Sequence, residues 1–369
     1  MKIDRRLFVN FDWVLPTLVL SICCIGLMNL YSVGYNLPDT TSTPSYVRQA
    51  YWIFIGLVMM LVVLSVDYHF IVRYAYVLYA ASVLLLFVVL LHGKVAQGSQ
   101  RWLMLWGFSF QPSELIKLTV IIVLARFFGD KNVTQEWGLK NLAAPLFILL
   151  LPSLLIVIQP DLGTTLFLGI LFFSIIILFR IKRRLIKCFA VSGVILIPLG
   201  WFFIQDYQRK RILTFLNPEM DPLGSGYHII QSMIAIGSGG LLGKGYLKGT
   251  QSQLKFLPEQ QTDFVFSVFA EEWGFLGVLI LIFLFLALIL WGFKIARRSR
   301  DMSGMLIAYG VTVYIFWGIF INIGMVLGIL PVVGIPLPFL SYGGSSMVVL
   351  MMGVGLLMNV SMRRFVFQP

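Results

Sequence analysis

The stretch from Lys255 to Gly277 carries four acidic side chains in a chain that otherwise avoids charge, and these are Glu259, Asp263, Glu271 and Glu272. A carboxylate can act as a general base by accepting the proton of an attacking hydroxyl group. The apolar run that follows is long enough to cross a bilayer, so we expect Asp263 at the start of a helix, where water meets the membrane. Ionisable groups at that depth usually mark function. An aspartate at a helix start can also serve only as a cap, and the residue type leaves both interpretations open.

The composition indicates which kind of fold positions these acids. Hydrophobic residues make up 59% of the 369 residues and charged residues 12%, whereas soluble domains carry about 25% charged residues. We therefore predict an all-α polytopic membrane protein that forms a single domain over residues 1–369. From the lengths of the apolar runs we expect about ten transmembrane helices, with cores at 13–34, 49–66, 74–91, 112–128, 142–158, 162–180, 186–205, 264–293, 304–328 and 346–362.

The distribution of basic residues predicts the orientation in the membrane. Lys and Arg gather near the N-terminus, at 180–187 and at 294–300, and few occur in the short loops on the other side. By the positive-inside rule, both termini then lie on the cytoplasmic side. The net charge of +12 is accordingly a topology signal, and we expect no nucleic-acid partner.

One predicted outer segment, about 205–262 between the seventh and eighth helices, is longer than any other and carries cations that the topology rule does not require. Its basic residues are Arg209, Lys210, Arg211, Lys244, Lys248 and Lys255. Residues 225–239 have the pattern of a short amphipathic helix. The glycine-rich residues after it miss the P-loop spacing, which needs glycine where Ser238 stands and Ser or Thr where Gly245 stands. We therefore expect no nucleotide-driven chemistry.

Three predicted helices begin in the same way, with proline at the expected first position and an acid within two residues. The pairs are Pro112 with Glu114, Pro160 with Asp161, and Pro258 with Glu259. Ordinary helix-start chemistry accounts for each pair taken singly. Together they place three positive helix ends at one membrane depth, an arrangement with which membrane proteins bind anionic groups.

Two opposite charges, Glu114 and Lys117, fall inside the fourth predicted span and can pair on one helix face. They form either a structural ion pair or a polar cavity wall, and charges within spans normally face a cavity or the bundle interior. Before this span, Arg101 lies among tryptophans, where it either extends toward the membrane interface or reaches an anionic head group.

The last linker, 328–346, is rich in Pro and Gly, and irregular backbone of this kind must be buried in protein or line a cavity. Ser345 or Ser346 is expected to cap the final helix. The three cysteines and three histidines are scattered, so we expect no zinc or haem site held by the protein. The residues thus suit a cavity for an amphiphile with a phosphate-rich head, and they leave open whether the protein transports it or reacts with it.

Five motifs carry a resemblance to a known family. GSQRWL, FQPSELIKL, QPDLGT, the block from KGTQSQLKFLPEQQTDF to AEEWGFLG, and PLPFLSYGGSS are similar to those of the SEDS family and cover essentially all predicted spans in order. The QQTDFVFSVFAEEWGFLG segment resembles the elongation branch of that family more than the division branch. The resemblance implies a peptidoglycan glycosyltransferase that polymerises lipid II at the outer face of the bacterial plasma membrane, beside a class B penicillin-binding protein and the elongation machinery.

The resemblance also implies roles for single residues. Asp263 matches the essential aspartate of the family and would be the general base for the acceptor sugar hydroxyl, while undecaprenyl pyrophosphate leaves. Substrate-binding positions would include Arg101, Glu114, Lys117, Asp161, Arg209, Lys210, Lys244, Lys248, Lys255 and Ser341. A Mg²⁺ or Mn²⁺ ion could assist at the pyrophosphate, although no ligand cluster indicates one. Should Asp263 not be the base, Glu259, Glu271 and Asp161 are the next candidates. A lipid II flippase and a scaffold for the elongation machinery remain the competing functions.

Overall fold

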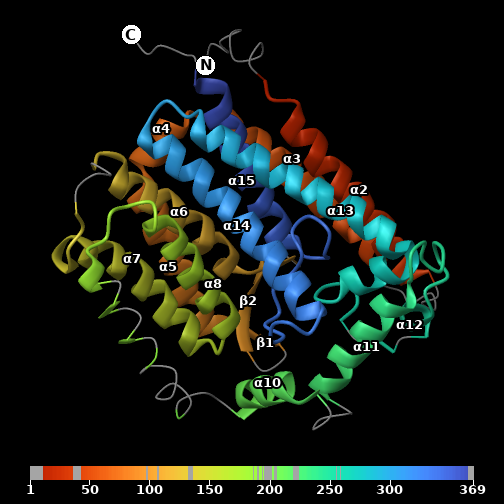
Figure 1. The fold of residues 1–369 in the computed structure, drawn as a ribbon. Helices are drawn as coiled ribbons and strands as arrows, with labels where there is room; N and C mark the ends of the chain where they lie inside the picture. The colour runs from red at the N-terminus through yellow and green to blue at the C-terminus, as the bar shows by residue number, and fades with distance from the viewer. Residues whose placement is uncertain are drawn as a thin grey trace.

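The computed structural model describes residues 11–35, 43–96, 99–105, 108–131 and 136–364, except 186, 189–190, 193, 195–201, 203–205, 219–223, 255 and 258. These residues form a helical bundle (Figure 1). Seven of the helices described are long and apolar enough to cross a membrane, and they are α2 (Val14–Gly34), α3 (Ser45–Ser65), α5 (Ala75–His92), α7 (Leu139–Ile158), α13 (Val265–Arg297), α14 (Met302–Val326) and α15 (Gly344–Arg363). The predicted polytopic membrane protein is confirmed.

Two further predicted spans are helices that differ from the rest. The helix α6 (Pro112–Gly129) carries three charged residues, and α8 (Leu162–Ile176) has 15 residues. The predicted span 186–205 lies mostly outside the described residues. The number of about ten spans therefore stays a prediction.

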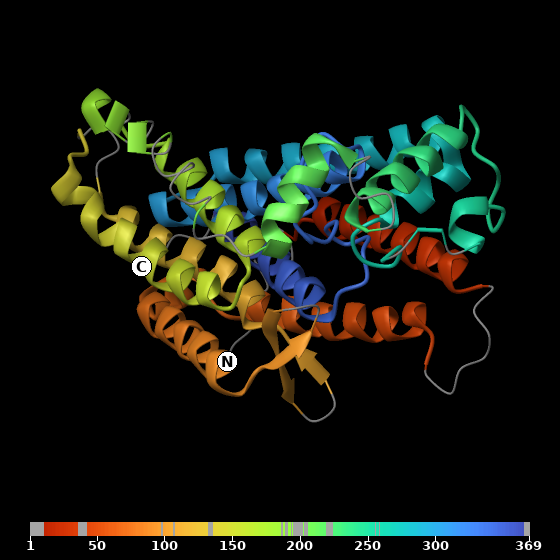
Figure 2. The same cartoon turned by 90° about the horizontal axis from the view of Figure 1, so that it is seen from below.

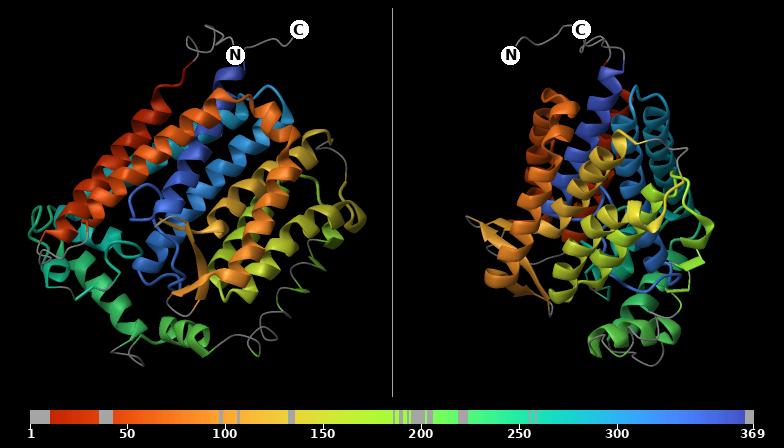
Figure 3. Two further views of the ribbon diagram at one scale, coloured as in Figure 1. Left: turned by 180° about the vertical axis from the view of Figure 1, so that it is seen from behind. Right: turned by 90° about the vertical axis from the view of Figure 1, so that its left-hand side faces the viewer.

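The center of the bundle is built from α6, α14 and α15, most of whose residues are buried. The helix α14 packs against α6, α13, α15 and α8, while α15 packs along α3. Figure 3 shows that α2 begins and α15 ends at the same end of the bundle, opposite the green helices of residues 206–238. A shorter helix, α4 (Tyr68–Arg73), joins α3 to α5 at that end.

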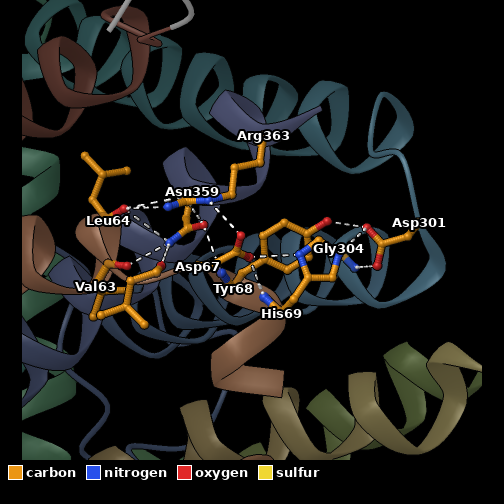
Figure 4. Close-up of polar contacts among 10 residues, drawn as sticks. Val63, Leu64, Asp67, Tyr68, His69, Asp301, Gly304, Asn359 and Arg363 are labelled. Carbon is orange, nitrogen blue, oxygen red and sulfur yellow. Dashed lines mark hydrogen bonds and ion pairs between the residues drawn. The ribbon is translucent and has the colours of Figure 1, made fainter. Parts of the chain in front are cut away.

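A polar cluster fixes the end of the bundle at which α15 finishes (Figure 4). The Arg363 guanidinium pairs with Asp67 at 3.4 Å, in the turn before α4. The Asn359 amide donates to the carbonyl of Val63 at 2.7 Å, and the Tyr68 hydroxyl donates to Asp301, the residue that caps α14. The cluster thus joins α3, α4, α14 and α15 through hydrogen bonds that satisfy otherwise open helix ends.

A small antiparallel sheet adds to the predicted all-helical fold at the opposite end. Its strands are β1 (Lys94–Ala96), β2 (Ser99–Leu105) and β3 (Phe108–Phe110), in the order β1-β2-β3. The sheet stands at one edge of the bundle, away from α11 (Figure 2). Because β2 contains Arg101, the sheet sets the position of that side chain.

The long outer segment is largely helical. It contains α10 (Asp206–Leu216), α11 (Ser225–Ser238) and α12 (Thr250–Gln253). The amphipathic helix predicted at 225–239 is therefore confirmed as α11. In Figure 1, α10, α11 and α12 lie together below the end of the bundle at which α13 begins.

The helix α13 is interrupted at Gly274, whose φ of 63° and ψ of −165° are open to glycine alone. The interruption leaves backbone groups without helical partners, and the glycine-rich turn before α12 bonds them. The amides of Lys244 and Gly245 donate to the carbonyls of Glu271 and Glu272, each at 3.0 Å, and in return two amides after the break donate to carbonyls of the turn. The turn and the broken helix approach closely at Gly243 and Gly274. A β-carbon on Gly274 would lie 2.2 Å from the backbone nitrogen of Gly243.

Candidate active site

The Asp263 side chain lies two residues before α13 and does not cap it. The N-cap residue is Phe264, and no side chain caps the helix. The alternative interpretation of Asp263 as only a helix cap is therefore wrong. The Asp263 carboxylate is available to interact with a bound molecule. Among the described residues, none donates a hydrogen bond to it and none forms an ion pair with it.

Backbone contacts hold Asp263 in place. The Asn322 amide of α14 donates to the Asp263 carbonyl at 3.1 Å and to the Ile335 carbonyl at 2.8 Å. The Ser341 hydroxyl donates to the Thr262 carbonyl at 2.6 Å. The linker 328–346 is thus fastened to the residues before α13, and Gly334 approaches the Asp263 carboxylate closely enough that a β-carbon there would lie 3.6 Å from Oδ2.

Asp263 opens into a cavity of about 310 Å³. The cavity collects side chains from β2, α6, α8, α10, the residues before α13, the linker, and the beginning of α15. The charged lining residues are Arg101, Glu114, Lys117, Arg211, Glu259 and Asp263. Three cations and three acids converge here from segments far apart in the sequence, as the predicted polar cavity requires.

The Asp263 carboxyl is tuned by this environment. Burial raises its pKa to about 6, and the nearby Glu259 carboxylate contributes in the same direction. The Arg211 and Arg101 guanidinium groups oppose the rise because they favour the charged form. An aspartate with a pKa near 6 accepts protons better than an ordinary aspartate and is still mostly ionised at neutral pH.

The Glu114 and Lys117 pair is confirmed and lines the cavity. The Lys117 ammonium lies 2.6 Å from Glu114 Oε1, and the Tyr314 hydroxyl donates to Glu114 Oε2 at 3.2 Å. The ammonium also lies 5.0 Å from the center of the Phe167 ring. The sequence left open whether these residues form a structural ion pair or a cavity wall. They do both, because the buried ion pair is part of the cavity lining.

Arg101 and Asp161 meet, with Arg101 Nε 3.4 Å from Asp161 Oδ2. Asp161 caps α8, because its carboxylate accepts from the Thr164 amide at 3.1 Å and from the Thr164 hydroxyl at 2.9 Å. It is not among the cavity-lining residues, whereas Arg101 and Thr164 are. Asp161 thus orients Arg101, and its predicted contact with substrate has no support in this geometry.

The three predicted helix beginnings differ from one another. Pro112 does occupy the first turn of α6. Pro160 precedes the cap residue Asp161, so it is not the first helical residue of α8. Pro258 lies outside the described residues, and α13 begins seven positions later. The beginning of α15 contributes in their place: Gly343, Gly344, Ser345 and Ser346 line the cavity, with Gly343 rather than a serine as the N-cap residue.

The cations predicted from the outer segment separate into groups. Arg211 lines the cavity, although it was not among the predicted site residues. Arg209, Lys210 and Lys248 lie away from it, and Lys255 lies outside the described residues. Lys244 pairs with the buried Glu271 at 2.7 Å. Ser341 is buried beneath the lining and bonds backbone groups. The predicted substrate contacts of these residues have no support at this cavity.

Sequence reasoning missed Arg211, Tyr314 and Asn322. The sequence signals only that Arg209, Lys210 and Arg211 cannot all face the cavity, because these three cations are consecutive on one short helix and successive residues point in directions about 100° apart. Tyr314 and Asn322 lie on α14 and are buried polar groups in an apolar span. Their partners on other segments cannot be read from the sequence.

Comparisons with known proteins agree with this site. The family model of the cell cycle proteins FtsW, RodA and SpoVE matches residues 12–365. The peptidoglycan glycosyltransferase MrdB of Escherichia coli (strain K12) is 47% identical over 310 residues, which is 84% of this chain and 83% of the relative. Stage V sporulation protein E of Bacillus subtilis (strain 168) is 38% identical over 358 residues, or 95% and 96% of the two chains.

Solved structures have the same fold. A chain from a peptidoglycan synthase complex that coordinates polymerization and crosslinking matches with a TM-score of 0.81 at 33% identity, over 96% of this chain and 98% of that chain. The rod shape determining protein RodA of Thermus thermophilus matches with a TM-score of 0.71 at 29% identity, over 97% and 98%. The resemblance inferred from the five sequence motifs is thereby confirmed.

Proposed function

Because the chain belongs to the cell cycle protein family of FtsW, RodA and SpoVE, we propose that it is a peptidoglycan glycosyltransferase that polymerises lipid II into glycan strands during cell elongation. The observation that carries the proposal is Asp263, an acid that opens into the cavity without a bonding partner among the described residues and has a pKa near 6. A carboxylate in this state is suited to take the proton of a sugar hydroxyl.

The reaction is a single displacement. The acceptor hydroxyl attacks the anomeric carbon of the donor, Asp263 takes its proton, and the bond to undecaprenyl pyrophosphate breaks. One displacement inverts the configuration at that carbon. The leaving group gains negative charge, and Arg101, Lys117 and Arg211, which line the cavity, stabilise it. The amide groups at the beginning of α15 add positive potential there.

The deciding experiment is polymerisation of lipid II by the purified protein, alone and with a class B penicillin-binding protein, beside Asp263→Asn. Glycan made by the wild type and not by the variant supports the proposal. Lipid II translocation in liposomes without glycan from either protein would support the flippase. Glycan that appears only through the activity of the partner would support the scaffold.

The partners, cation and orientation follow from the same proposal. The chain would work with a class B penicillin-binding protein in the elongation machinery, in the bacterial inner membrane, with both termini cytoplasmic. The shared end at which α2 begins and α15 ends supports this orientation. Labelling of Lys248→Cys with an impermeant reagent on spheroplasts tests the orientation, since the side chain is exposed.

Polymerisation in EDTA, with Mg²⁺ or Mn²⁺ added back, tests the need for a divalent cation at the pyrophosphate.

A further inference from the structure

A second cavity lies at the far end of the bundle from Asp263, where α2 begins and α13 and α15 end (Figure 1). Its volume is about 340 Å³. One molecule in liquid water occupies about 30 Å³, so the cavity has room for a group much larger than water. It is lined by Asp12, Trp13, Trp291, Lys294, Arg298 and Arg364 among others. None of these residues takes part in the proposed reaction.

The charge of this cavity is unbalanced. Lys294, Arg298 and Arg364 face a single lining carboxylate, that of Asp12. That carboxylate already accepts from the Trp291 indole at 2.8 Å and from the Ser361 hydroxyl at 3.2 Å, both on its Oδ2. Within the part of the chain that the structure describes, neither Lys294 nor Arg298 forms an ion pair. An anion entering the cavity would therefore meet a net positive site.

The aromatic residues place the cavity at the depth of lipid head groups. Trp13, the residue before α2, is 71% exposed, and the Lys294 ammonium lies 3.5 Å from the center of the Trp291 ring. Tryptophans concentrate at the membrane interface, where one part of the ring is apolar and the other wet. From this level an apolar track of exposed side chains, Leu290, Leu286 and Phe283, runs along α13 toward the middle of the span.

We propose that this cavity binds the phosphate of an anionic phospholipid, whose acyl chains lie along the exposed face of α13. Lys294, Arg298 and Arg364 are the phosphate ligands, and the aromatic rings pack on the glycerol region. Basic pockets between helix ends are a known way for membrane proteins to hold anionic head groups. A soluble phosphate would use the same cations but would gain nothing from the apolar track.

Binding is measured with the full-length protein after removal of lipid, by native mass spectrometry and by thermal unfolding with added lipid. The probes are phosphatidylglycerol, phosphatidylcholine and water-soluble glycerol phosphate. We expect phosphatidylglycerol to be retained and to raise the Tm more than phosphatidylcholine does, and glycerol phosphate to have no effect. Equal effects of both lipids, or an equal effect of glycerol phosphate, would overturn the proposal.

Two variants decide which residues are responsible. The triple variant Lys294→Gln, Arg298→Gln and Arg364→Gln should bind phosphatidylglycerol about 100-fold more weakly, since each of the three cations near a charged head group contributes about a factor of five. Arg126→Gln is the matched control, because that arginine pairs with Asp130 at 3.6 Å. An equal loss in the control, or no loss in the triple variant, refutes the site.

Asp12→Asn keeps the proposal testable should the triple variant not fold. The asparagine oxygen can still accept from the Trp291 indole and the Ser361 hydroxyl, so the variant keeps these two bonds, gives up the exposed bond from the Val14 amide, and removes the one lining carboxylate. Affinity for phosphatidylglycerol should rise about fivefold. An unchanged or weaker affinity would contradict the proposed site on its own.

Discussion

Asp263 and Glu271 belong to the same acidic stretch, yet their side chains differ in hydrogen bonding and in access to the cavity. The Asp263 carboxylate faces a cavity and accepts no hydrogen bond from the described residues. Glu271 is completely buried, and its Oε1 accepts from the Lys244 ammonium at 2.7 Å, from the Thr250 hydroxyl at 3.0 Å and from the Gln251 amide at 3.0 Å. A carboxylate oxygen that accepts from three donors holds its side chain in one place.

The comparison shows that bonding, more than charge, separates a chemical acid from a structural one. Glu272 supports this view, because it is also buried and accepts from the Ser32 hydroxyl of α2. Both glutamates fasten the glycine-rich turn and α2 to the interrupted α13. An acid that must accept a proton needs an open approach and a pKa within reach of neutral pH, and of these three only Asp263 has the approach.

The strongest test of the comparison is Asp263→Asn. We expect glycan synthesis to fall about 10²- to 10⁴-fold, the usual contribution of a general base. Stability at pH 7 should stay equal or rise slightly, because the raised pKa means that the ionised carboxylate disfavours the folded state above pH 6. Lipid II polymerisation and thermal unfolding in detergent measure the two effects. Near wild-type synthesis would end the assignment and bring Glu259 forward.

Glu271→Gln should have the reverse profile. The change leaves the partly buried Lys244 ammonium without its carboxylate, which should destabilise the protein by about 2–3 kcal/mol. Glycan synthesis per folded molecule should stay within a few fold of the wild type. Thermal unfolding and activity normalised to folded protein are the measurements, and Lys248→Met is the control, because Lys248 is exposed nearby. Loss of activity without loss of stability would assign chemistry to Glu271.

The Glu114 and Lys117 pair lies between these extremes, since it is both bonded and part of the cavity wall. Removal of either partner leaves one buried charge, so each single variant should be worse than the double variant Glu114→Gln with Lys117→Met. A double-mutant cycle on stability should give a coupling energy of about 1–3 kcal/mol. Additive effects would show that the two side chains do not interact.

The two arginines of α10 offer a finer contrast. Arg211 lines the cavity and Arg209 does not. Arg211→Gln should lower kcat/KM about tenfold, which corresponds to one charged contact of about 1.4 kcal/mol. Arg209→Gln should change it less than about twofold. Steady-state kinetics of lipid II consumption separates the two variants. Equal losses would mean that the total charge of α10 matters and that lining the cavity gives Arg211 no special role.

The smallest effect concerns pH. Because Asp263 must be deprotonated to accept a proton, synthesis should fall as the pH drops below about 6. Glu259→Gln removes a carboxylate that raises this pKa, so the acidic limb should move to lower pH. Arg211→Gln removes a cation that lowers it, so the limb should move to higher pH. A profile that shifts with neither change would indicate a different titrating group.

The sequence predicted the spans well because run length alone determines them. The expected 304–328 is Met302–Val326, and the expected 346–362 is Gly344–Arg363. It could not predict the interruption at Gly274, since the apolar pattern continues through it, nor the partner of Lys244, which lies 27 residues away. Asp263 was found because its type and location were unusual. Arg211 was missed because only the fold decides which of three adjacent cations faces inward.

The interruption of α13 also bears on how freely this part of the chain can vary in evolution. The turn at 240–245 is attached to the broken helix by amide and carbonyl groups, which every residue type supplies except proline at the donors. Leu241 and Leu242 point outward, 71% and 78% exposed. Relatives could therefore replace most side chains of the turn and keep its shape. The glycines would be the exception: Gly243 and Gly274 because their backbones touch, and Gly240 and Gly245 because their φ angles are +57° and +100°.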